Sequence, residues 1–412
     1  MNINTKALAA LLILVGGAIV AAYTIGMKQG GKPATAQSSM DSTEVSVEQA
    51  QQQPKNLFPN DQANAEARFT HFRVGNRNVK GMVADGNEVW VGTSGGAIRY
   101  DLNKENYKLY DVKNGSLISN GVFHLSKVRD KIMVGTYGGG MSVYDPKADS
   151  WKNYNIPDGL ADQFVYDIDE DEQGNYWIAT WSGVNFVPGG KMEDSKGWKT
   201  FTVENTKGGL PNDWVYGVEV GRNGDVWFAT EGGLARFDKH QKWTNWQHDK
   251  SGNGLGAAYE KVKDDIAFSN DPAKASKHHA TQKAQQGLDT VKVGYNPNYI
   301  VSMIVDTDGA VWCGTWGAGL SRFDGKTWTT YTTKEGLPGN HVFMLKNSKK
   351  GRFWIGTNKG LARFNQDGKS FSVMNQKSGL YADNVFSMAE AADGSLWVGS
   401  FGGVARLSNL KL

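Results

Sequence analysis

The sequence of 412 residues predicts an all-β fold, a seven-bladed β-propeller with four-stranded blades. Three observations lead to this prediction. A short segment recurs seven times, glycine and aromatic residues are abundant, and an extra strand-like segment precedes the first repeat. Glycine supplies 51 of the residues, well above the usual share of roughly 7%, and shows no collagen period. Many glycines and aromatics with few prolines indicate short strands joined by tight turns.

The recurring segment is an aromatic or methionine residue, an apolar residue, a small residue and Thr or Ser. It is followed by a glycine turn and a further apolar strand. Its copies begin at Trp90, Met133, Trp177, Trp227, Trp312, Trp354 and Trp397. The intervals between them are 43, 44, 50, 85, 42 and 43 residues. Units of this length with four short strands each are typical of propeller blades.

The outermost strand of each unit carries an aromatic pair at i and i+3, except that the last pair before the end is Phe371/Met374 and the final unit lacks one. An unassigned pair, Phe69/Phe72, precedes the first unit. We therefore expect this N-terminal strand to complete the last blade and close the ring, because closure pairs an edge that would otherwise be exposed.

The doubled interval contains no further copy of the segment, so residues 248–293 are interpreted as an insertion between two blades. It leaves from the end of the propeller that carries the glycine turns. Two interpretations of it stay open, a lid over that end or a surface excursion.

The propeller is assigned to residues 68–412, and two segments precede it. Residues 7–27 carry no charge and reach about 30 Å as a helix, so residues 1–27 are predicted to be a transmembrane signal anchor. Cleavage after Ala36 is the alternative. Residues 28–67 are polar and rich in Gln, Ser, Ala and Pro, which is typical of a flexible linker.

Composition excludes several classes of protein. With 45 Lys+Arg against 42 Asp+Glu, the net charge of +3 gives no argument for nucleic-acid binding. The single cysteine, Cys313, excludes a disulfide framework and a cysteine zinc cluster, and is interpreted as a buried apolar residue. The adjacent His278 and His279 do not form a metal-ligand pattern, so no metal and no cofactor is predicted.

The units, for example Gly336 to Val342 followed by Trp354 to Phe364, resemble the two-component regulator propeller repeat. The resemblance covers roughly residues 68–409. It implies a periplasmic ligand-sensing propeller of the kind found in membrane-bound hybrid histidine kinases. The chain departs from that pattern because no kinase or DNA-binding region follows, so a signal would pass through a partner protein. The implied localisation is the bacterial inner membrane, with a single span and the propeller in the periplasm.

Positions that vary among the units are the candidates for binding, because a repeat needs the same residue only where it packs. Two sets of such positions lie at one end of the predicted propeller. They are the residue after the repeated Thr or Ser, and the residues just before each first strand. The predicted ligand- or partner-binding residues are Tyr137, Trp181, Glu231, Trp316, Phe401, Arg77, Asp213, Trp214, Tyr299, His341 and Asp383. A funnel with aromatic walls suits a sugar, an aromatic metabolite or a peptide. The alternative is that these aromatics pack against one another.

No catalytic residue is assigned, and the protein is interpreted as a non-enzymatic sensor or interaction scaffold. Propeller lyases that act on streptogramins have similar repeats and use a His-x-His arrangement with a nearby Glu and magnesium. None of the seven histidines here forms that arrangement. Two alternatives remain. One is a carbohydrate-active or lyase-type enzyme that uses Asp213, Glu231 and Asp383, and the other is an architectural subunit of an envelope complex. The predicted partner is an unidentified envelope protein or small ligand.

Overall fold

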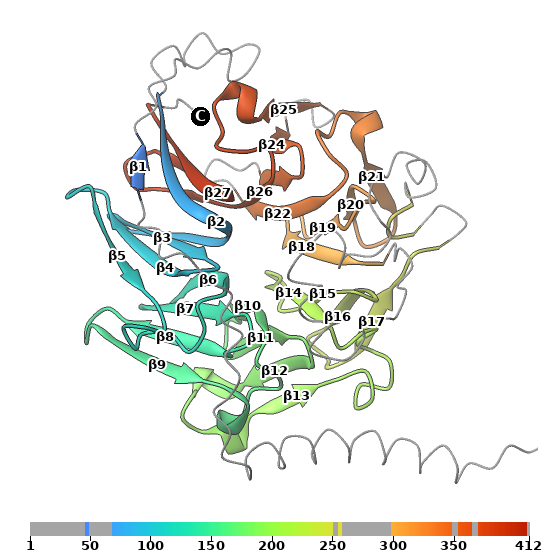
Figure 1. Cartoon of the computed structure of the whole chain (residues 1–412). Helices are drawn as coiled ribbons and strands as arrows, with labels where there is room; N and C mark the ends of the chain where they lie inside the picture. The colour runs from blue at the N-terminus through green and yellow to red at the C-terminus, as the bar shows by residue number, and fades with distance from the viewer. Residues whose placement is uncertain are drawn as a thin grey trace, which may run out of the picture. The chain divides into compact units, whose positions relative to one another are not determined.

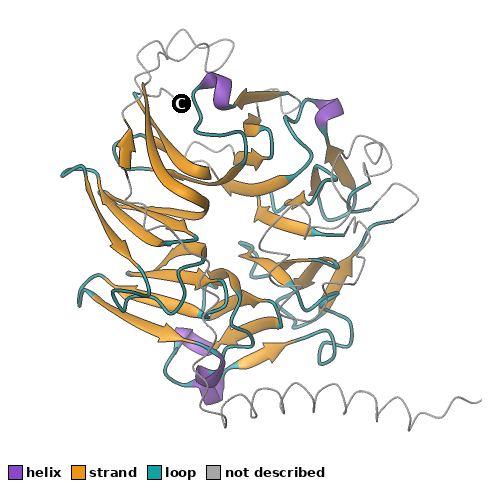
Figure 2. Ribbon diagram, in the orientation of Figure 1, coloured by secondary structure: helices purple, strands orange, loops and turns teal. Residues whose placement is uncertain are grey.

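The computed structural model describes residues 46–48, 68–249, 254–257, 298–347, 353–364 and 370–409, all within the unit Val45–Leu412. These residues form an all-β propeller (Figures 1 and 2). The predicted anchor at 1–27 and most of the predicted linker lie outside the described residues. Within the described ranges, no helix has the length and apolar character needed to cross a membrane.

Five of the sheets are separate four-stranded meanders in which each strand pairs with the next along the chain. The first two are β6 (Val122–Val128), β7 (Lys131–Thr136), β8 (Met141–Asp145), β9 (Ser150–Tyr154), and β10 (Val165–Glu170), β11 (Tyr176–Thr180), β12 (Gly183–Val187), β13 (Lys199–Phe201). The next is β14 (Val215–Val220), β15 (Val226–Thr230), β16 (Gly233–Phe237), β17 (Trp243–Trp246). The last two are β18 (Ile300–Val305), β19 (Val311–Thr315), β20 (Leu320–Phe323), β21 (Trp328–Tyr331), and β22 (Val342–Asn347), β23 (Phe353–Thr357), β24 (Gly360–Phe364), β25 (Phe371–Met374).

The remaining strands form one seven-stranded sheet in the order β26-β27-β2-β3-β4-β5, with β1 paired to β2. Its members are β1 (Ser46–Glu48), β2 (Arg68–Asp85), β3 (Glu88–Thr93), β4 (Gly96–Asp101), β5 (Asn106–Tyr110), β26 (Val385–Glu390) and β27 (Leu396–Ser408). The prediction of seven separate four-stranded sheets is therefore wrong. The physical reason is the length of β2, whose first part pairs with β27 and whose second part pairs with β3, so one strand belongs to both sets of strands.

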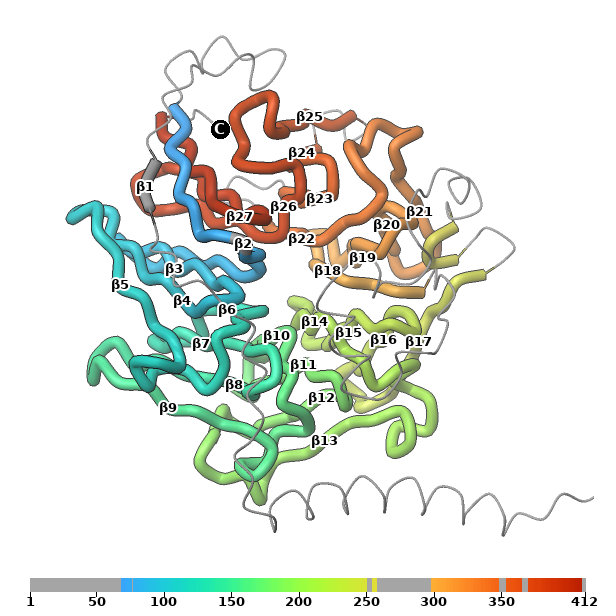
Figure 3. The backbone as a smooth tube through the Cα atoms, viewed as in Figure 1, coloured from blue at the N-terminus to red at the C-terminus, as the bar shows by residue number. Residues whose placement is uncertain are grey.

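The predicted closure by the N-terminal strand is confirmed. Phe69 lies opposite Leu407 and Phe72 opposite Val404 in the antiparallel pair β2–β27. The smoothed trace in Figure 3 shows β2 running beside β27. Closure joins segments more than 300 residues apart and removes the free edge of β27.

The innermost strands of the sheets contact one another in cyclic order, β2, β6, β10, β14, β18, β22, β26 and back to β2. The repeated glycine permits this approach. A Cβ on Gly135 would lie 2.6 Å from the carbonyl oxygen of Val165, and one on Gly356 would lie 2.7 Å from that of Val385. Both carbonyls belong to the innermost strand of the next sheet, so any larger residue at these two positions would push adjacent strands apart.

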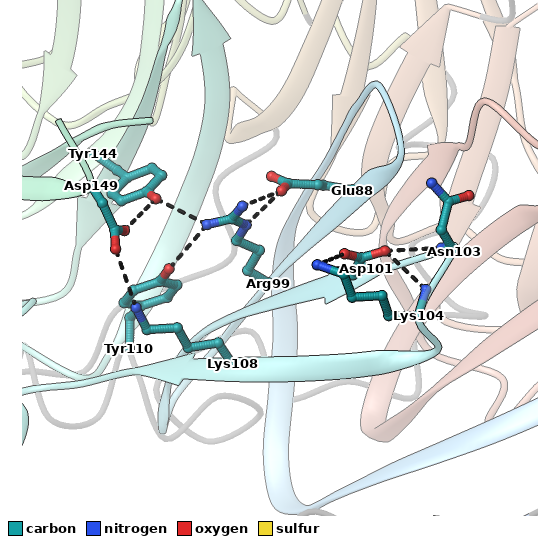
Figure 4. Close-up of polar contacts among 9 residues, drawn as sticks. All are labelled: Glu88, Arg99, Asp101, Asn103, Lys104, Lys108, Tyr110, Tyr144 and Asp149. Atoms are coloured by element: carbon teal, nitrogen blue, oxygen red, sulfur yellow. Dashed lines mark hydrogen bonds and ion pairs between the residues drawn. The ribbon is translucent and has the colours of Figure 1, made fainter. Parts of the chain in front are cut away.

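The repeated tryptophans fill the space between sheets, and Trp90, Trp354 and Trp397 are fully buried. Trp90 stacks on Tyr110 and also contacts Tyr144 of the next sheet. Around this aromatic core, Arg99 donates to Glu88 (2.7 Å) and to the hydroxyl of Tyr144 (2.9 Å), as Figure 4 shows. A polar network thus closes over the apolar contact between two neighbouring sheets.

The repeated threonines hold the turns that follow them by hydrogen bonds. The hydroxyl of Thr180, for example, donates to the carbonyl of Gly183 (2.8 Å), and Thr93, Thr136, Thr230, Thr315 and Thr357 tie their glycine turns in the same way. Cys313 is buried in the core, as predicted.

Two predicted segments need correction or completion. Ser46–Glu48, which was predicted to belong to the flexible linker, forms β1 because it pairs with the edge of β2 that β27 leaves open. Of the insertion, residues 258–293 lie outside the described residues, but Leu255 near its start is fully buried among Trp227, Ile300 and Phe323. The described helices are single 3-10 turns, η2 (Ile156–Asp158), η3 (Pro188–Gly190), η4 (Ser195–Gly197), η5 (Thr333–Glu335) and η6 (Gln376–Ser378).

Candidate functional site

Every innermost strand contains a β-bulge directly after the Val or Ile that begins its pairing with the next strand along the chain. In β10, for instance, the register with β11 shifts between Val165 and Asp167, so Tyr166 has no partner across the sheet. Bulges re-aim a side chain away from the pleat. The bulged residues are Lys80, Phe123, Tyr166, Tyr216, Val301, Phe343 and Phe386, which we call the inner ring.

The side chains of the inner ring contact one another around the propeller. Phe123 meets Tyr166 (4.8 Å between ring centroids), Tyr166 meets Tyr216 (4.9 Å), and Phe343 meets Phe386 (5.1 Å). Beside Val301 the contacts pass through two residues outside the inner ring. Tyr299 contacts both Tyr216 and Trp316, and Trp316 contacts Phe343. The Lys80 ammonium lies 4.5 Å from the centroid of Phe386 and 5.4 Å from that of Phe123, which closes the circle.

The inner ring has two unlike arcs. Tyr166 and Tyr216 are buried, with 3% and 6% of their surface exposed, whereas Lys80, Phe123, Phe343 and Phe386 are only half-buried. The half-buried residues are consecutive around the ring, so apolar surface and one amine are presented together. Burial lowers the pKa of Lys80 to about 8. The faces of two phenyl rings act in the opposite direction, because they favour the ammonium form.

Five of the predicted binding residues join the buried arc in one aromatic cluster. They are Tyr137, Trp181, Trp214, Tyr299 and Trp316, packed with Phe164, Tyr166 and Tyr216. Trp181 and Tyr299 are 5% and 2% exposed, so the expectation that these loop aromatics stand open to a ligand is wrong for both. The reason is mutual packing, as between Trp181 and Trp214, whose centroids are 4.5 Å apart.

Glu231 and His341 lie against the same cluster. The hydroxyl of Tyr216 donates to a carboxylate oxygen of Glu231 (3.2 Å), and burial raises the pKa of Glu231 to about 7. The imidazole of His341 packs edge-on against Trp316, and burial lowers its pKa to about 4. A carboxyl group that titrates near neutrality beside a phenol can accept or donate a proton.

The other predicted residues do not join this cluster. Asp213 accepts a hydrogen bond from the backbone N–H of Val203 (2.7 Å), and Asp383 accepts one from Gln376 (2.8 Å), so both staple the loop that enters their strand. Arg77 lies over Gly95, where an added Cβ would collide with its guanidinium. Phe401 is 46% exposed. Of the three carboxylates proposed for an enzyme, Asp213 and Asp383 therefore hold loops by hydrogen bonds, and Glu231 is buried.

A second set of polar side chains lies further along the innermost strands, on β10 and β22. Asp167 accepts from the N–H of Val218 (2.9 Å) and Asp169 from that of Val220 (2.8 Å), both on the next sheet. Lys346 donates to the carbonyl of Met82 (3.2 Å). Burial raises the pKa of Asp167 and of Asp169 to about 6. No group of His, Cys, Asp or Glu within the described ranges is arranged to hold a metal ion.

The two-component regulator propeller family matches residues 159–182, 294–317 and 336–359. Each match begins before an innermost strand and ends two residues after the repeated Thr, in the sheets that begin with β10, β18 and β22. Three segments of the chain therefore match the two-component regulator propeller repeat. No curated protein matches the sequence.

Solved structures share the fold of these repeats. The extracellular domain of a putative hybrid two-component system from B. thetaiotaomicron matches with a TM-score of 0.59 and 17% identity over 82% of this chain. The chain spans only 40% of that protein's length. A virginiamycin B lyase from Staphylococcus aureus, with quinupristin, gives 0.57 at 12% identity, covering 83% of this chain and 99% of the lyase. YCF48 bound to a D1 peptide gives 0.53 at 11% identity, covering 88% and 99%.

Sequence analysis missed the inner ring of the repeats, although a signal for it exists. Counted from the Val or Ile that begins the pairing of each innermost strand with the next strand, the first and fourth residues are apolar in every repeat, whereas the second varies from Lys80 to Val301 to Tyr166. A variable large residue between two invariant apolar positions indicates a side chain that leaves the packed core. The buried charges Asp167, Asp169 and Lys346 give a similar signal, since they interrupt apolar strands.

Proposed function

We propose that this propeller is a binding module whose ligand or protein partner contacts the half-buried arc of the inner ring. The observation that carries the proposal is the arrangement of Phe123, Phe343 and Phe386 on consecutive innermost strands around Lys80. Half-buried aromatic groups that lie together around one polar group are typical of a binding site. The role as a sensor or interaction scaffold is supported by the two-component regulator repeats and by the fold shared with an extracellular domain.

The proposal includes the architecture and location expected from the sequence. We count the seven-stranded sheet as two blades, which makes seven in all. The support is that seven innermost strands are bulged, and that Phe69 and Phe72 pair in the register of Phe371 and Met374 in the preceding sheet. A membrane anchor at residues 1–27 and a periplasmic propeller are part of the same proposal, supported by the length of the uncharged segment 7–27.

Binding can be tested with the full-length protein and a panel of small carboxylates, aryl glycosides and aromatic tripeptides, scored by the shift in thermal unfolding. We expect at least one class to bind, and Phe343→Ala to weaken that binding about tenfold or more, since truncated aromatic anchors typically cost above 1 kcal/mol. Tyr107→Ala, an exposed aromatic on the outer strand β5, is the matched control. Equal binding by the Phe343 variant and wild type would contradict the proposed site.

A lyase or hydrolase is the second candidate. One observation favours it, the buried Glu231 with a pKa of about 7 in contact with Tyr216, in a chain that shares its fold with a lyase. Turnover of a ligand found in the binding screen, lost in Glu231→Gln while binding persists, would favour the enzyme. Binding without turnover favours the sensor or scaffold. Co-purification with a fixed set of envelope proteins, unaffected by any small molecule, would favour an architectural subunit.

A further inference from the structure

Lys80 is the one cationic member of the inner ring. Its position at the bulge of β2 turns the side chain out of the sheet, between the rings of Phe123 and Phe386. Within the described part of the chain, its ammonium makes no hydrogen bond and no ion pair with a carboxylate. Lys80 is half-buried, and an ammonium group that is partly removed from water without a partner is unfavourable. Two phenyl faces compensate only in part, since each contributes about 0.5–2 kcal/mol.

The other buried lysine shows the contrast. Lys346 donates a hydrogen bond to the carbonyl of Met82, and Glu390, Asp167 and Glu219 act on it by charge attraction. The fold therefore uses Lys346 of β22 to satisfy a carbonyl of β2, the second innermost strand further round the propeller. For Lys80 burial alone perturbs the pKa, and no carboxylate offsets it. A lysine that the fold itself does not use, in half-buried apolar surroundings, is suited to an external anion.

The neighbours of Lys80 limit what that anion can be. Phe123, Phe343 and Phe386 are half-buried and form an apolar bed on both sides of the amine. A single ammonium balances one negative charge, whereas a phosphate dianion is typically bound by several donors or by the fork of an arginine. A carboxylate attached to a flat apolar group matches both the charge and the aromatic surface.

We propose that Lys80 anchors the carboxylate of a small ligand whose apolar or aromatic body lies on Phe123, Phe343 and Phe386. This inference rests on the proposed binding function and names the class of ligand for the same site. The ligand class includes aryl carboxylates and the C-terminal carboxylate of a peptide that ends in an aromatic residue. The ammonium donates a charge-assisted hydrogen bond to the carboxylate, and the rings around it exclude water from the pair.

The test uses two probes of the same shape, hydrocinnamate and its uncharged amide, with the full-length protein. We expect the carboxylate to bind more tightly than the amide by about tenfold or more, the range for a charge-assisted hydrogen bond. Lys80→Met keeps the length of the side chain and removes the charge. It should abolish the preference for the carboxylate, whereas Lys80→Arg retains it. Lys359→Met, an exposed lysine in the turn after Thr357, is the control and should leave the preference unchanged.

A second readout is independent of affinity. After reductive methylation with ¹³C-formaldehyde, the Lys80 resonance should titrate below those of the exposed lysines. Hydrocinnamate should then raise its pKa, because a neighbouring anion favours the ammonium form. Inorganic phosphate that competes with hydrocinnamate at equal concentration would overturn the carboxylate assignment.

The possible failures are distinguishable. If Phe343→Ala weakens binding of either probe but Lys80→Met does not change the preference for the carboxylate, the role of Lys80 is wrong and the proposed binding site stands. If neither Phe343→Ala nor Lys80→Met changes the binding of any ligand that binds wild type, both proposals are wrong. The melting temperature of Lys80→Met serves as the check on folding, and it should equal or exceed that of wild type because a buried charge is removed.

Discussion

Single residues near the inner ring carry charges whose cost depends on pH. Glu231 is buried and its pKa is raised to about 7, so the folded protein favours the protonated carboxyl group. In the unfolded chain this group ionises at lower pH. The folded state therefore binds more protons than the unfolded state between about pH 4.5 and 7, and stability falls as pH rises through that interval.

Glu231→Gln should remove this pH dependence. Wild type is expected to lose up to about 3 kcal/mol of unfolding free energy between pH 4.5 and 7.5 through this group, because one pKa unit is worth about 1.4 kcal/mol. The amide cannot ionise and should lose much less. Urea unfolding followed by tryptophan fluorescence at the two pH values measures the difference. Glu172→Gln, in an exposed turn, is the control. Parallel pH profiles for wild type and the Glu231 variant would show that the carboxyl is not held neutral.

At the scale of the strand, backbone groups on the inner edge of a sheet lack partners within that sheet, and side chains of the preceding sheet supply some of these partners. An innermost strand has a neighbour on one side only, so backbone groups on its other side need partners. Asp169 of β10 accepts from the N–H of Val220 in β14, and the hydroxyl of Ser302 in β18 donates to the carbonyl of Val342 in β22. These bonds fix the spacing and register of adjacent sheets as well as satisfying polar groups.

Asp169→Ala should therefore destabilise the protein by about 1–3 kcal/mol, the cost of a buried donor left without its acceptor. Asp169→Asn keeps a carbonyl oxygen at the same place and should cost less. Amide hydrogen exchange provides a local measurement, since the N–H of Val220 should exchange faster in the alanine variant than in the asparagine variant. If Val220 exchanges at the same rate in both variants and in wild type, the side chain of Asp169 does not protect the edge.

At the scale of the whole molecule, closure depends on contacts between the two ends of the described chain. Phe72 stacks on Trp397 with ring centroids 5.1 Å apart and meets Tyr100 edge-on at 5.4 Å. These three residues lie on β2, β27 and β4, so one side chain joins both parts of the seven-stranded sheet. A ring fastened in this way unfolds at the seam only by exposing aromatic core.

Phe72→Ala should lower the free energy of unfolding by about 3–5 kcal/mol, the usual cost of removing a buried phenylalanine. Met374→Ala, at the equivalent register position of the preceding sheet, should cost about 2–5 kcal/mol and serves as the matched internal case. Chemical denaturation of the full-length protein measures both. A loss below about 1 kcal/mol for Phe72 alone, with the Met374 variant destabilised as expected, would mean that the seam contributes little to stability.

Much of the fold follows from local sequence. The positions of the Trp and Thr residues, the burial of Cys313 and the pairing of Phe69 and Phe72 with the end of the chain were all predictable, because a repeat places the same residue in the same surroundings each time. The surroundings of the predicted binding residues could be foreseen only in part. Trp181 and Tyr299 lie at the expected end, but they are buried.

The sequence by itself determined the propeller repeat and the strand that closes it, since these depend on residue types at fixed spacing. Only the tertiary structure decided which large residues remain accessible. Burial of a ring depends on the neighbouring sheet, as Tyr166 under Tyr216 and Phe386 beside Lys80 show, and those neighbours come from distant parts of the chain. Likewise, β2 joins two sets of strands into one sheet because its first part pairs with β27 and its second part with β3, which no spacing of repeats could reveal.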